Sequence, residues 1–279
     1  MQWRQFLTPV RSISADDARE YMQKKHLEAF TLLDVRQESE YASGHIPGAK
    51  LIPLPVLTER LAELDRGRET IVYCASGGRS RVAAQLLVSK GFQEVINLAG
   101  GFSAWGGNAA FLNEEKGIEY FSGNESPRST LAAAFSLEAG LESFYLSMVD
   151  KIPDRQVKQL FQKLSQIEVK HQDRIINLYT EITGEQTTRE AFASGPVQEV
   201  LEGGMTTEEY ANLFMPEWDT LEGVIELAMS IETQAMDLYS RAADRAADEK
   251  SKMALIKIAE EERTHLVQLG KLMDRLLSG

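Results

Sequence analysis

The sequence predicts two domains: an α/β domain that has a parallel sheet with flanking helices, followed by an all-α four-helix bundle. In the first hundred residues, short apolar runs alternate with helical segments, which is the pattern of a parallel α/β sheet. In the second half, a Glu that is followed thirty positions later by Glu-x-x-His occurs twice, which indicates a duplicated helical hairpin. We therefore assign residues 1–107 to the first domain, 108–126 to an ordered connector and 127–279 to the bundle.

Length and composition exclude several classes of protein. The chain has 279 residues, enough for two domains that each bury a core. Its net charge of −12 argues against a general nucleic-acid partner, and no apolar run reaches the roughly 20 residues of a membrane span. Residues 1–9 lack the apolar stretch of a signal peptide, and the single cysteine suits a reducing compartment. We expect a cytoplasmic protein with no nucleic-acid partner and no membrane partner.

The apolar runs of the first domain predict its strands and helices. The clearest strand is Thr70–Tyr73, which ends directly at Cys74 and leads through a Gly-rich loop into an amphipathic helix over 80–90. Further strands are expected at 30–35 and 94–98, an apolar patch at 51–54, and helices after Ser14 and over 57–64.

Cys74 lies where the chain would stabilise an anion. The loop joins the carboxyl end of a strand to the N-terminus of a helix, so its backbone N–H groups favour negative charge and lower a thiol pKa. We predict that Cys74 is the catalytic residue, as a thiolate or a persulfide; the alternative is a small buried hydrophobe. For Arg79 a structural ion pair or a solvated helix start is an equal alternative. The predicted anion cradle consists of Ala75, Ser76, Gly77, Gly78 and Arg79.

This loop resembles that of the rhodanese family of sulfurtransferases. The matching segments are Leu33-Asp34-Val35-Arg36, Gly44-His45-Ile46-Pro47-Gly48-Ala49, the Cys-x-x-Gly-x-Arg loop at 74–79, and Gly100-Gly101 with Trp105. The resemblance implies that Cys74 takes a sulfane sulfur from a small donor and passes it to a thiol acceptor. Thiosulfate-using members often carry a basic residue where this chain has Ala75, which argues against thiosulfate as the donor. A phosphatase is the weaker alternative. Phosphatases place five residues between such a cysteine and its arginine, to surround the oxygens of a phosphate, whereas this loop has four.

The remaining polar residues singled out in the first domain are predicted to be structural. We expect Asp34 and Arg36 to pair within the fold and His45 to hold its loop through hydrogen bonds. His26, which follows two lysines, is expected at the surface.

In the second half, two Glu-x-x-His pairs are the main functional signal. Residues i and i+3 share a helix face, so each pair can point at one metal ion. Two hairpins would bring four carboxylates and two imidazoles to the middle of a bundle, the ligand set expected of a di-iron carboxylate site. The alternative is that these acids are solvated on a surface helix. The predicted metal ligands are Glu138, Glu168, His171, Glu232, Glu262 and His265.

Breakers and caps predict the four helices of the bundle. The first begins at Ser126-Pro127 and runs to about 149, and the second begins at Pro153-Asp154 and ends near Gly184. The third is expected to open at Pro216, and the fourth to cover 249–277. Residues 185–215 hold Gly195-Pro196 and Gly203-Gly204, and are predicted to form short helices in a long crossover.

This half resembles the rubrerythrin branch of the ferritin-like superfamily. The resemblance implies that the six residues bind two iron ions, with Mn or Zn as possible substitutes, and that Glu168 and Glu262 bridge them. Rubrerythrins carry a rubredoxin module with four cysteines, so this chain, with only Cys74, would need an external electron donor. They also place an extra glutamate where this chain has Ala235. Possible second-shell residues are Glu142, Tyr145 and Tyr239, which could instead be a solvated acid and ordinary core tyrosines.

The leading functional hypothesis is a two-domain redox enzyme. It combines sulfur transfer through a Cys74 persulfide with a di-iron site that reduces peroxide or oxygen. One alternative is a sulfur-trafficking or persulfide-sensing protein whose bundle is an interaction or dimerisation module, and another is an iron-oxidising or iron-handling protein. Ferritin-like relatives commonly pair, so a homodimer through the bundle is expected.

Overall fold

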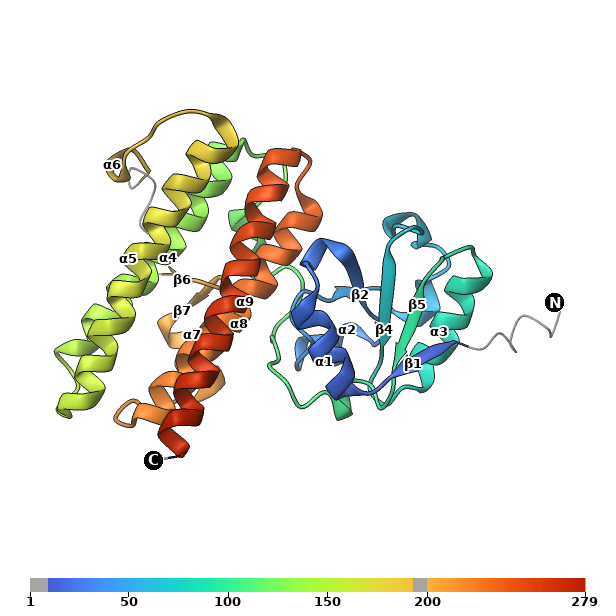
Figure 1. The fold of residues 1–279 in the computed structure, drawn as a ribbon, viewed down its shortest axis with the longest axis horizontal. Coiled ribbons are helices and arrows are strands. Elements are labelled where there is room, and N and C mark those ends of the chain that lie inside the picture. Colours follow the sequence, from blue (N-terminus) through green and yellow to red (C-terminus); the bar gives the residue numbers. More distant parts are fainter. Residues whose placement is uncertain (1–9, 193–199, 279) are drawn as a thin grey trace. The chain divides into compact units, whose positions relative to one another are not determined.

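The computed structural model describes residues 10–192 and 200–278 of the chain. It divides into two units, Met1–Glu114 and Glu115–Gly279 (Figure 1). The predicted connector is shared between them: Ala110 forms a β-bridge with His45 in the first unit, whereas Gly123 accepts a backbone hydrogen bond from Ala247 in the second. Gly195-Pro196 of the predicted crossover lies outside the described residues.

Five short parallel strands form the sheet of the first unit. Their spatial order is β1-β5-β4-β2-β3, which places β4, the strand before Cys74, in the middle of the sheet. Helices follow the strands as the sequence predicts, so the predicted α/β class is confirmed. The strands are β1 (Arg11–Ile13), β2 (Phe30–Asp34), β3 (Lys50–Leu51), β4 (Glu69–Tyr73) and β5 (Val95–Leu98), and the helices are α1 (Ala15–Lys24), α2 (Glu38–Ala42) and α3 (Gly78–Ser89).

Side chains on the two faces of this sheet build two separate cores. Successive residues of a strand point to opposite faces, so Ile71 joins the core that contains α1, whereas Val72 joins the core that contains α3. Cys74 itself belongs to the α3 core. Burial on both faces explains why these strands are continuous apolar runs.

The predicted helix over 57–64 is wrong. The 3₁₀ helix Leu54–Val56 precedes this segment, which itself contains turns and a second short 3₁₀ helix, Leu61–Glu63. Pro53 begins the first of them, and Asp65 caps the following turn by accepting a hydrogen bond from the Gly67 N–H. Only Leu57 and Leu64 of the segment are fully buried, which is too little apolar surface for a packed helix face.

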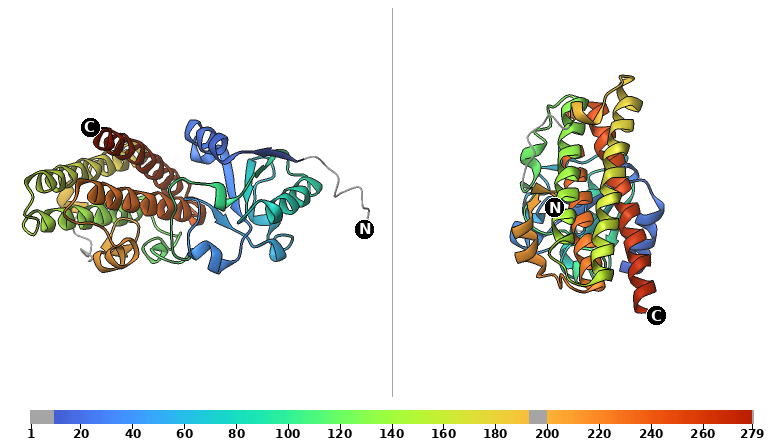
Figure 2. Two further views of the ribbon diagram at one scale, coloured as in Figure 1. Left: turned by 90° about the horizontal axis from the view of Figure 1, so that it is seen from below. Right: turned by 90° about the vertical axis from the view of Figure 1, so that its left-hand side faces the viewer.

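Four long helices form the bundle of the second unit, as predicted. Helices α4 and α5 pack as one antiparallel hairpin and α8 and α9 as the other, and Figure 2 shows them from two further directions. Each begins at a side chain that accepts a hydrogen bond from a first-turn N–H, namely Ser126, Asp154, Thr220 and Asp248. The helices are α4 (Pro127–Val149), α5 (Arg155–Thr183), α8 (Leu221–Arg245) and α9 (Glu249–Leu277).

The prediction that Pro216 opens the third helix is wrong, because α8 begins five residues later, after the Thr220 cap. The crossover between the hairpins also contains strands that the sequence does not predict. Its described elements are α6 (Arg189–Phe192), the antiparallel hairpin of β6 (Val200–Leu201) and β7 (Met205–Thr206), and α7 (Thr207–Phe214).

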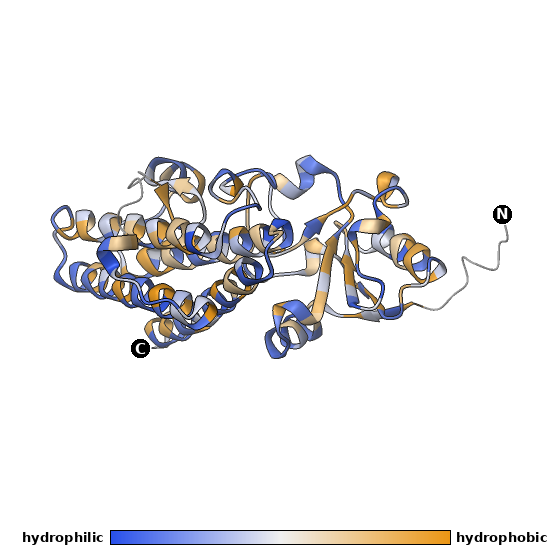
Figure 3. Cartoon of the chain, turned by 90° about the horizontal axis from the view of Figure 1, so that it is seen from above, coloured by the Kyte–Doolittle hydropathy of each residue, from blue (hydrophilic) through white to orange (hydrophobic). Residues whose placement is uncertain are grey.

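The colouring by hydropathy separates the two kinds of element. In Figure 3 the strands are largely hydrophobic, whereas the long helices alternate hydrophobic and hydrophilic residues along their length. That pattern is typical of amphipathic helices that bury one face. Within residues 10–192 and 200–278, no helix combines the length and the apolar character needed to cross a bilayer.

Candidate functional site

Cys74 begins a loop that surrounds its sulfur with hydrogen-bond donors. The Gly77 N–H donates to the Cys74 Sγ at 3.1 Å, and the Ser80 hydroxyl lies 3.5 Å from the same sulfur. Gly77 has a φ of 94°, in the left-handed region, and serves as the N-cap of α3. The loop therefore directs the N-terminus of α3 at the thiol, as the sequence predicts.

These donors change the acidity of the thiol. Burial opposes ionisation of Cys74, but the Ser80 hydroxyl and the backbone N–H groups of Ser76, Gly77 and Ser80 outweigh it and lower the pKa of the thiol. Cys74 is only 1% exposed. A buried thiol with a lowered pKa is suited to nucleophilic attack on sulfur.

Ser80→Ala is expected to slow sulfur transfer about tenfold at neutral pH, because the hydroxyl 3.5 Å from the ionised sulfur is lost together with its 2.7 Å hydrogen bond to Asn97 Oδ1. With the pKa of Cys74 raised, the acid limb of the pH–rate profile should move to higher pH, and the two rates should converge at high pH. Ser89→Ala, on the exposed side of the same helix, is the control. Superimposable pH profiles for wild type and Ser80→Ala would contradict this role.

A second glycine allows the loop to pack against the turn after β5. The Phe102 N–H donates to the Cys74 carbonyl at 2.7 Å, and the Ser103 N–H donates to the Ala75 carbonyl at 2.9 Å. A Cβ atom at Gly101 would collide with the Cys74 carbonyl oxygen, so only glycine allows this approach. The predicted segment Gly100-Gly101 thus packs directly against the backbone of the cysteine loop.

Arg79 is engaged in an ion pair within the fold. Its guanidinium makes two hydrogen bonds to the carboxylate of Glu40, at 2.6 and 2.7 Å, and lowers the pKa of Glu40 to about 2. Both side chains are about one-third exposed. The positive charge next to the loop is therefore largely neutralised.

The other polar residues of the first unit have structural roles, as predicted. Arg36 binds the carboxylate of buried Asp34 and also donates to the Gly44 carbonyl. The His45 ring stacks on Tyr41, with ring centroids 3.5 Å apart, and its Nδ1 lies 3.0 Å from the Tyr41 carbonyl oxygen. His26 is exposed.

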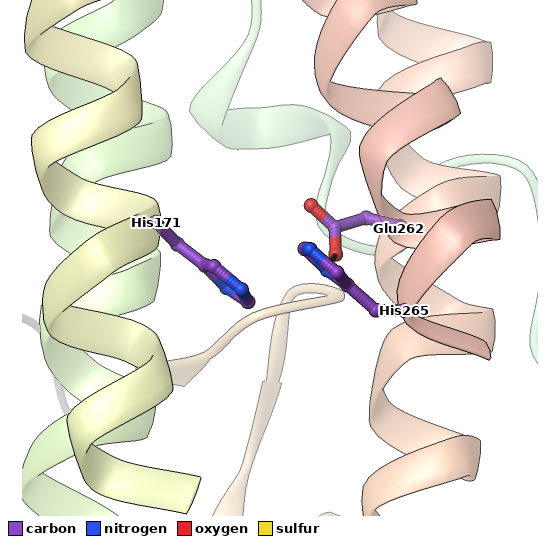
Figure 4. Close-up of side chains that lie close together, drawn as sticks. All are labelled: His171, Glu262 and His265. Carbon is purple, nitrogen blue, oxygen red and sulfur yellow. Dashed lines mark hydrogen bonds and ion pairs between the residues drawn. The ribbon is translucent and has the colours of Figure 1, made fainter. Parts of the chain in front are cut away.

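In the second unit, the four long helices bring all six predicted ligands to one place in the bundle. Figure 4 shows His171 on α5 and His265 on α9 pointing toward each other, with Glu262 beside them. The two rings are stacked, with centroids 4.0 Å apart. The carboxylates of Glu138, Glu168, Glu232 and Glu262 are at most 5% exposed.

The two halves of this cluster have nearly the same geometry. Nδ1 of His171 lies 2.9 Å from Glu168 and 3.4 Å from Glu138. Nδ1 of His265 lies 2.8 Å from Glu262 and 3.7 Å from Glu232. The duplication seen in the sequence thus becomes a pseudo-two-fold arrangement around one centre.

The donor atoms fit a pair of metal ions. The buried donor atoms of the cluster face one another: Nδ1 of His171 lies 2.9 Å from Oε2 of Glu168 and 3.4 Å from Oε2 of Glu138, and Nδ1 of His265 lies 3.7 Å from Oε2 of Glu232. Burial raises the pKa of Glu168 and Glu262 well above the usual range. Carboxylate and imidazole donors suit Fe or Mn and also accept Zn. Bound cations would neutralise this buried charge and replace the contacts that these donor atoms make with one another.

The predicted second shell is less directly connected to these ligands. Glu142 accepts a hydrogen bond of 2.7 Å from Gln172, which in turn binds Arg189. Tyr145 is buried and its ring contacts Phe161. The hydroxyl of Tyr239 is buried, and burial, nearby carboxylates and its interaction with the Glu202 side chain raise its pKa.

One residue of this cluster is absent from the sequence prediction. Glu202, in the turn between β6 and β7, has no exposed surface and lies with Glu138 and Glu262 in a group of possible metal ligands. Because Glu202 does not lie on a helix, no i+3 or i+4 spacing links it to the other ligands. The only signal in the sequence is an isolated acid between Leu201 and Gly203-Gly204.

Comparison with known protein families identifies both domains. The rhodanese-like domain model matches residues 14–108, and the rubrerythrin model matches residues 129–273. These matches define a two-domain protein that joins a sulfurtransferase fold to a rubrerythrin-type di-iron domain. The rubrerythrin match covers more than half of the chain, so the chain belongs to the rubrerythrin family. It carries a rhodanese-like domain before the bundle.

The similar individual proteins resemble a short part of the chain. "Uncharacterized protein YqhL" of Bacillus subtilis is 45% identical over 76 residues, which are 27% of this chain and 60% of that protein. "Sulfurtransferase" of Allochromatium vinosum is 39% identical over 74 residues, covering 26% of this chain and 69% of that protein. "Thiosulfate sulfurtransferase GlpE" of Coxiella burnetii is 38% identical over 93 residues, covering 30% and 87%. These relatives indicate a rhodanese-type enzyme domain.

Proposed function

We propose that the first domain transfers sulfane sulfur through a persulfide on Cys74. The observation that supports this proposal is the Gly77 N–H and the Ser80 hydroxyl beside a buried sulfur whose pKa is lowered. The Cys74 thiolate attacks the outer sulfur of a donor, an S–S bond forms at Sγ, and the donor's own sulfur bond breaks with the electron pair leaving on the donor fragment. A thiolate acceptor then attacks the outer sulfur, and Cys74 leaves as a thiolate.

The charge around this loop bears on the donor. Thiosulfate appears in the name of the Coxiella burnetii relative, but Ala75 gives this loop no added positive charge. Glu40 neutralises Arg79, the cation of the loop. We therefore propose a small persulfide or other weakly charged sulfane donor rather than a dianion.

We propose that the bundle holds two iron ions and reduces peroxide or oxygen. One half of the site would consist of Glu138, Glu168 and His171, and its symmetric counterpart of Glu232, Glu262 and His265. When bound, the metal pair supplies the two electrons that peroxide reduction requires. Manganese or zinc could occupy the same donors, but zinc has no redox chemistry.

The side chains of the site have distinct roles in this proposal. The imidazoles are partly exposed, with side-chain exposures of 11% for His171 and 21% for His265, so a small oxidant can approach on their side. The glutamates are buried and would hold the metal ions away from water. The buried Tyr239 hydroxyl remains protonated at neutral pH, since burial raises its pKa, and can hold a proton beside the carboxylates.

Anaerobically reduced, iron-loaded protein is expected to consume about one equivalent of hydrogen peroxide per pair of metal ions, since each pair gives up two electrons. Stopped-flow absorbance would follow oxidation of the site, and a peroxide electrode would follow loss of the oxidant. Repeated turnover requires an external electron donor, because a single cysteine cannot bind a second iron centre. Oxidation no faster than that of free ferrous ion in the same buffer would contradict the peroxidase proposal.

A further inference from the structure

Glu202 is a buried acid beside the Tyr239 hydroxyl. The residue has no exposed surface, and both carboxylate oxygens lack a hydrogen-bond partner. Burying an ionised carboxylate without a partner is strongly unfavourable, and even a neutral acid normally finds a hydrogen bond. A cation bound by the Glu202 carboxylate would offset the cost of burying it.

The turn that carries Glu202 is held firmly in place. The Tyr210 hydroxyl donates to the Glu202 backbone carbonyl at 2.7 Å. Gly203 follows with a φ of 83°, and a Cβ atom there would lie 2.7 Å from the Gln234 Cβ and 3.1 Å from the Ala235 nitrogen. The turn thus packs tightly against α8, which fixes the backbone beside Glu202.

That carboxylate faces ligands from both halves of the metal cluster. Single donor atoms of Glu138, Glu202 and Glu262 lie within 4.8 Å of one another. Glu138 also groups with Glu168 and His171, whereas Glu262 also groups with the two histidines. In Figure 4 the turn of the β6–β7 hairpin passes behind the labelled side chains.

We infer that Glu202 is a seventh ligand of the two-metal site, contributed by the crossover rather than by a helix. This inference rests on the proposed metal site, and it adds one carboxylate that has no counterpart in the duplicated halves. Four ionised glutamates balance two divalent cations. A fifth adds negative charge, which favours the more highly charged oxidation state of the bound metal.

Glu202→Gln tests this inference because the change keeps the size of the side chain and removes its charge. Iron affinity, measured anaerobically by competition with a chromogenic chelator, should weaken about tenfold or more. A tenfold loss lowers the metal-derived stabilisation by about 1.4 kcal/mol, so the rise in melting temperature on iron binding should shrink. The metal-free variant should melt no lower than metal-free wild type, since a buried acid has been removed. The midpoint potential should rise.

Glu208→Gln is the matched control, because Glu208 is an exposed acid six residues further along the same segment. A second variant relocates the carboxylate. Ala235 lies one turn after Glu232 and beside the Gly203 turn, so Glu202→Ala combined with Ala235→Glu should recover iron affinity that Glu202→Ala alone loses.

The outcomes separate this inference from the proposed function. Wild-type protein that binds no iron would overturn both. Wild-type protein with two bound iron ions, together with a folded Glu202→Gln variant of unchanged iron affinity and unchanged potential, would overturn the role of Glu202 alone.

Discussion

Replacing Cys74 by serine is expected to abolish sulfur transfer, with a loss of more than about a thousandfold in rate. A serine hydroxyl stays protonated at neutral pH, and the hydrogen bonds of the loop, which stabilise a thiolate, cannot ionise it. No other cysteine can substitute, because the chain has only one. Sulfur transfer to cyanide or a thiol, and the mass gain of one sulfur atom on the peptide that contains Cys74, are the measurements.

The iron site provides the control for this variant. Cys74→Ser changes one atom in the first unit, so iron content and peroxide consumption should equal those of wild type. Substantial sulfur transfer by the serine variant would show that Cys74 does not carry the sulfur. Loss of peroxide consumption in a folded, iron-loaded variant would show instead that the two activities depend on each other.

Replacing Glu168 by glutamine is expected to remove tightly bound iron. Glu168 is 1% exposed and lies 2.9 Å from His171, and residues that only orient metal ligands already contribute about 10–100-fold to affinity. Loss of a predicted bridging ligand should therefore weaken iron binding by more than about 100-fold. Iron content by mass spectrometry of anaerobically purified protein should fall from about two atoms per chain to one or none.

Glu181→Gln is the matched control on the same helix. Glu181 lies at the exposed end of α5, where it pairs with Arg174, so its replacement removes the same charge outside the cluster. Circular dichroism should show unchanged helix content in both variants, and sulfur transfer by Cys74 should persist in both. Two iron atoms retained by Glu168→Gln would contradict the assignment of this glutamate as a ligand.

The periodic features of this protein could be predicted from its sequence. Glu168/His171 and Glu262/His265 each share a helix face because three residues correspond to nearly one turn, and the equal spacing to Glu138 and Glu232 follows from the duplication. The Cys74 loop is equally local, since a strand, a tight Gly-rich turn and a helix follow one another directly. Short-range geometry alone determined these arrangements.

Only the tertiary structure decided what non-local packing brings together. The sequence gives no sign that Glu40 of α2 neutralises Arg79 of α3, because the two residues meet only when both helices are folded against the sheet. Pro216 is a sound helix-start signal, yet the Thr220 cap determines the start of α8. Glu202 reaches the metal cluster on a hairpin within the crossover, where no helical period links it to the other ligands. The position of Glu202 depends on packing between segments that are distant in the sequence, so no local pattern predicts it.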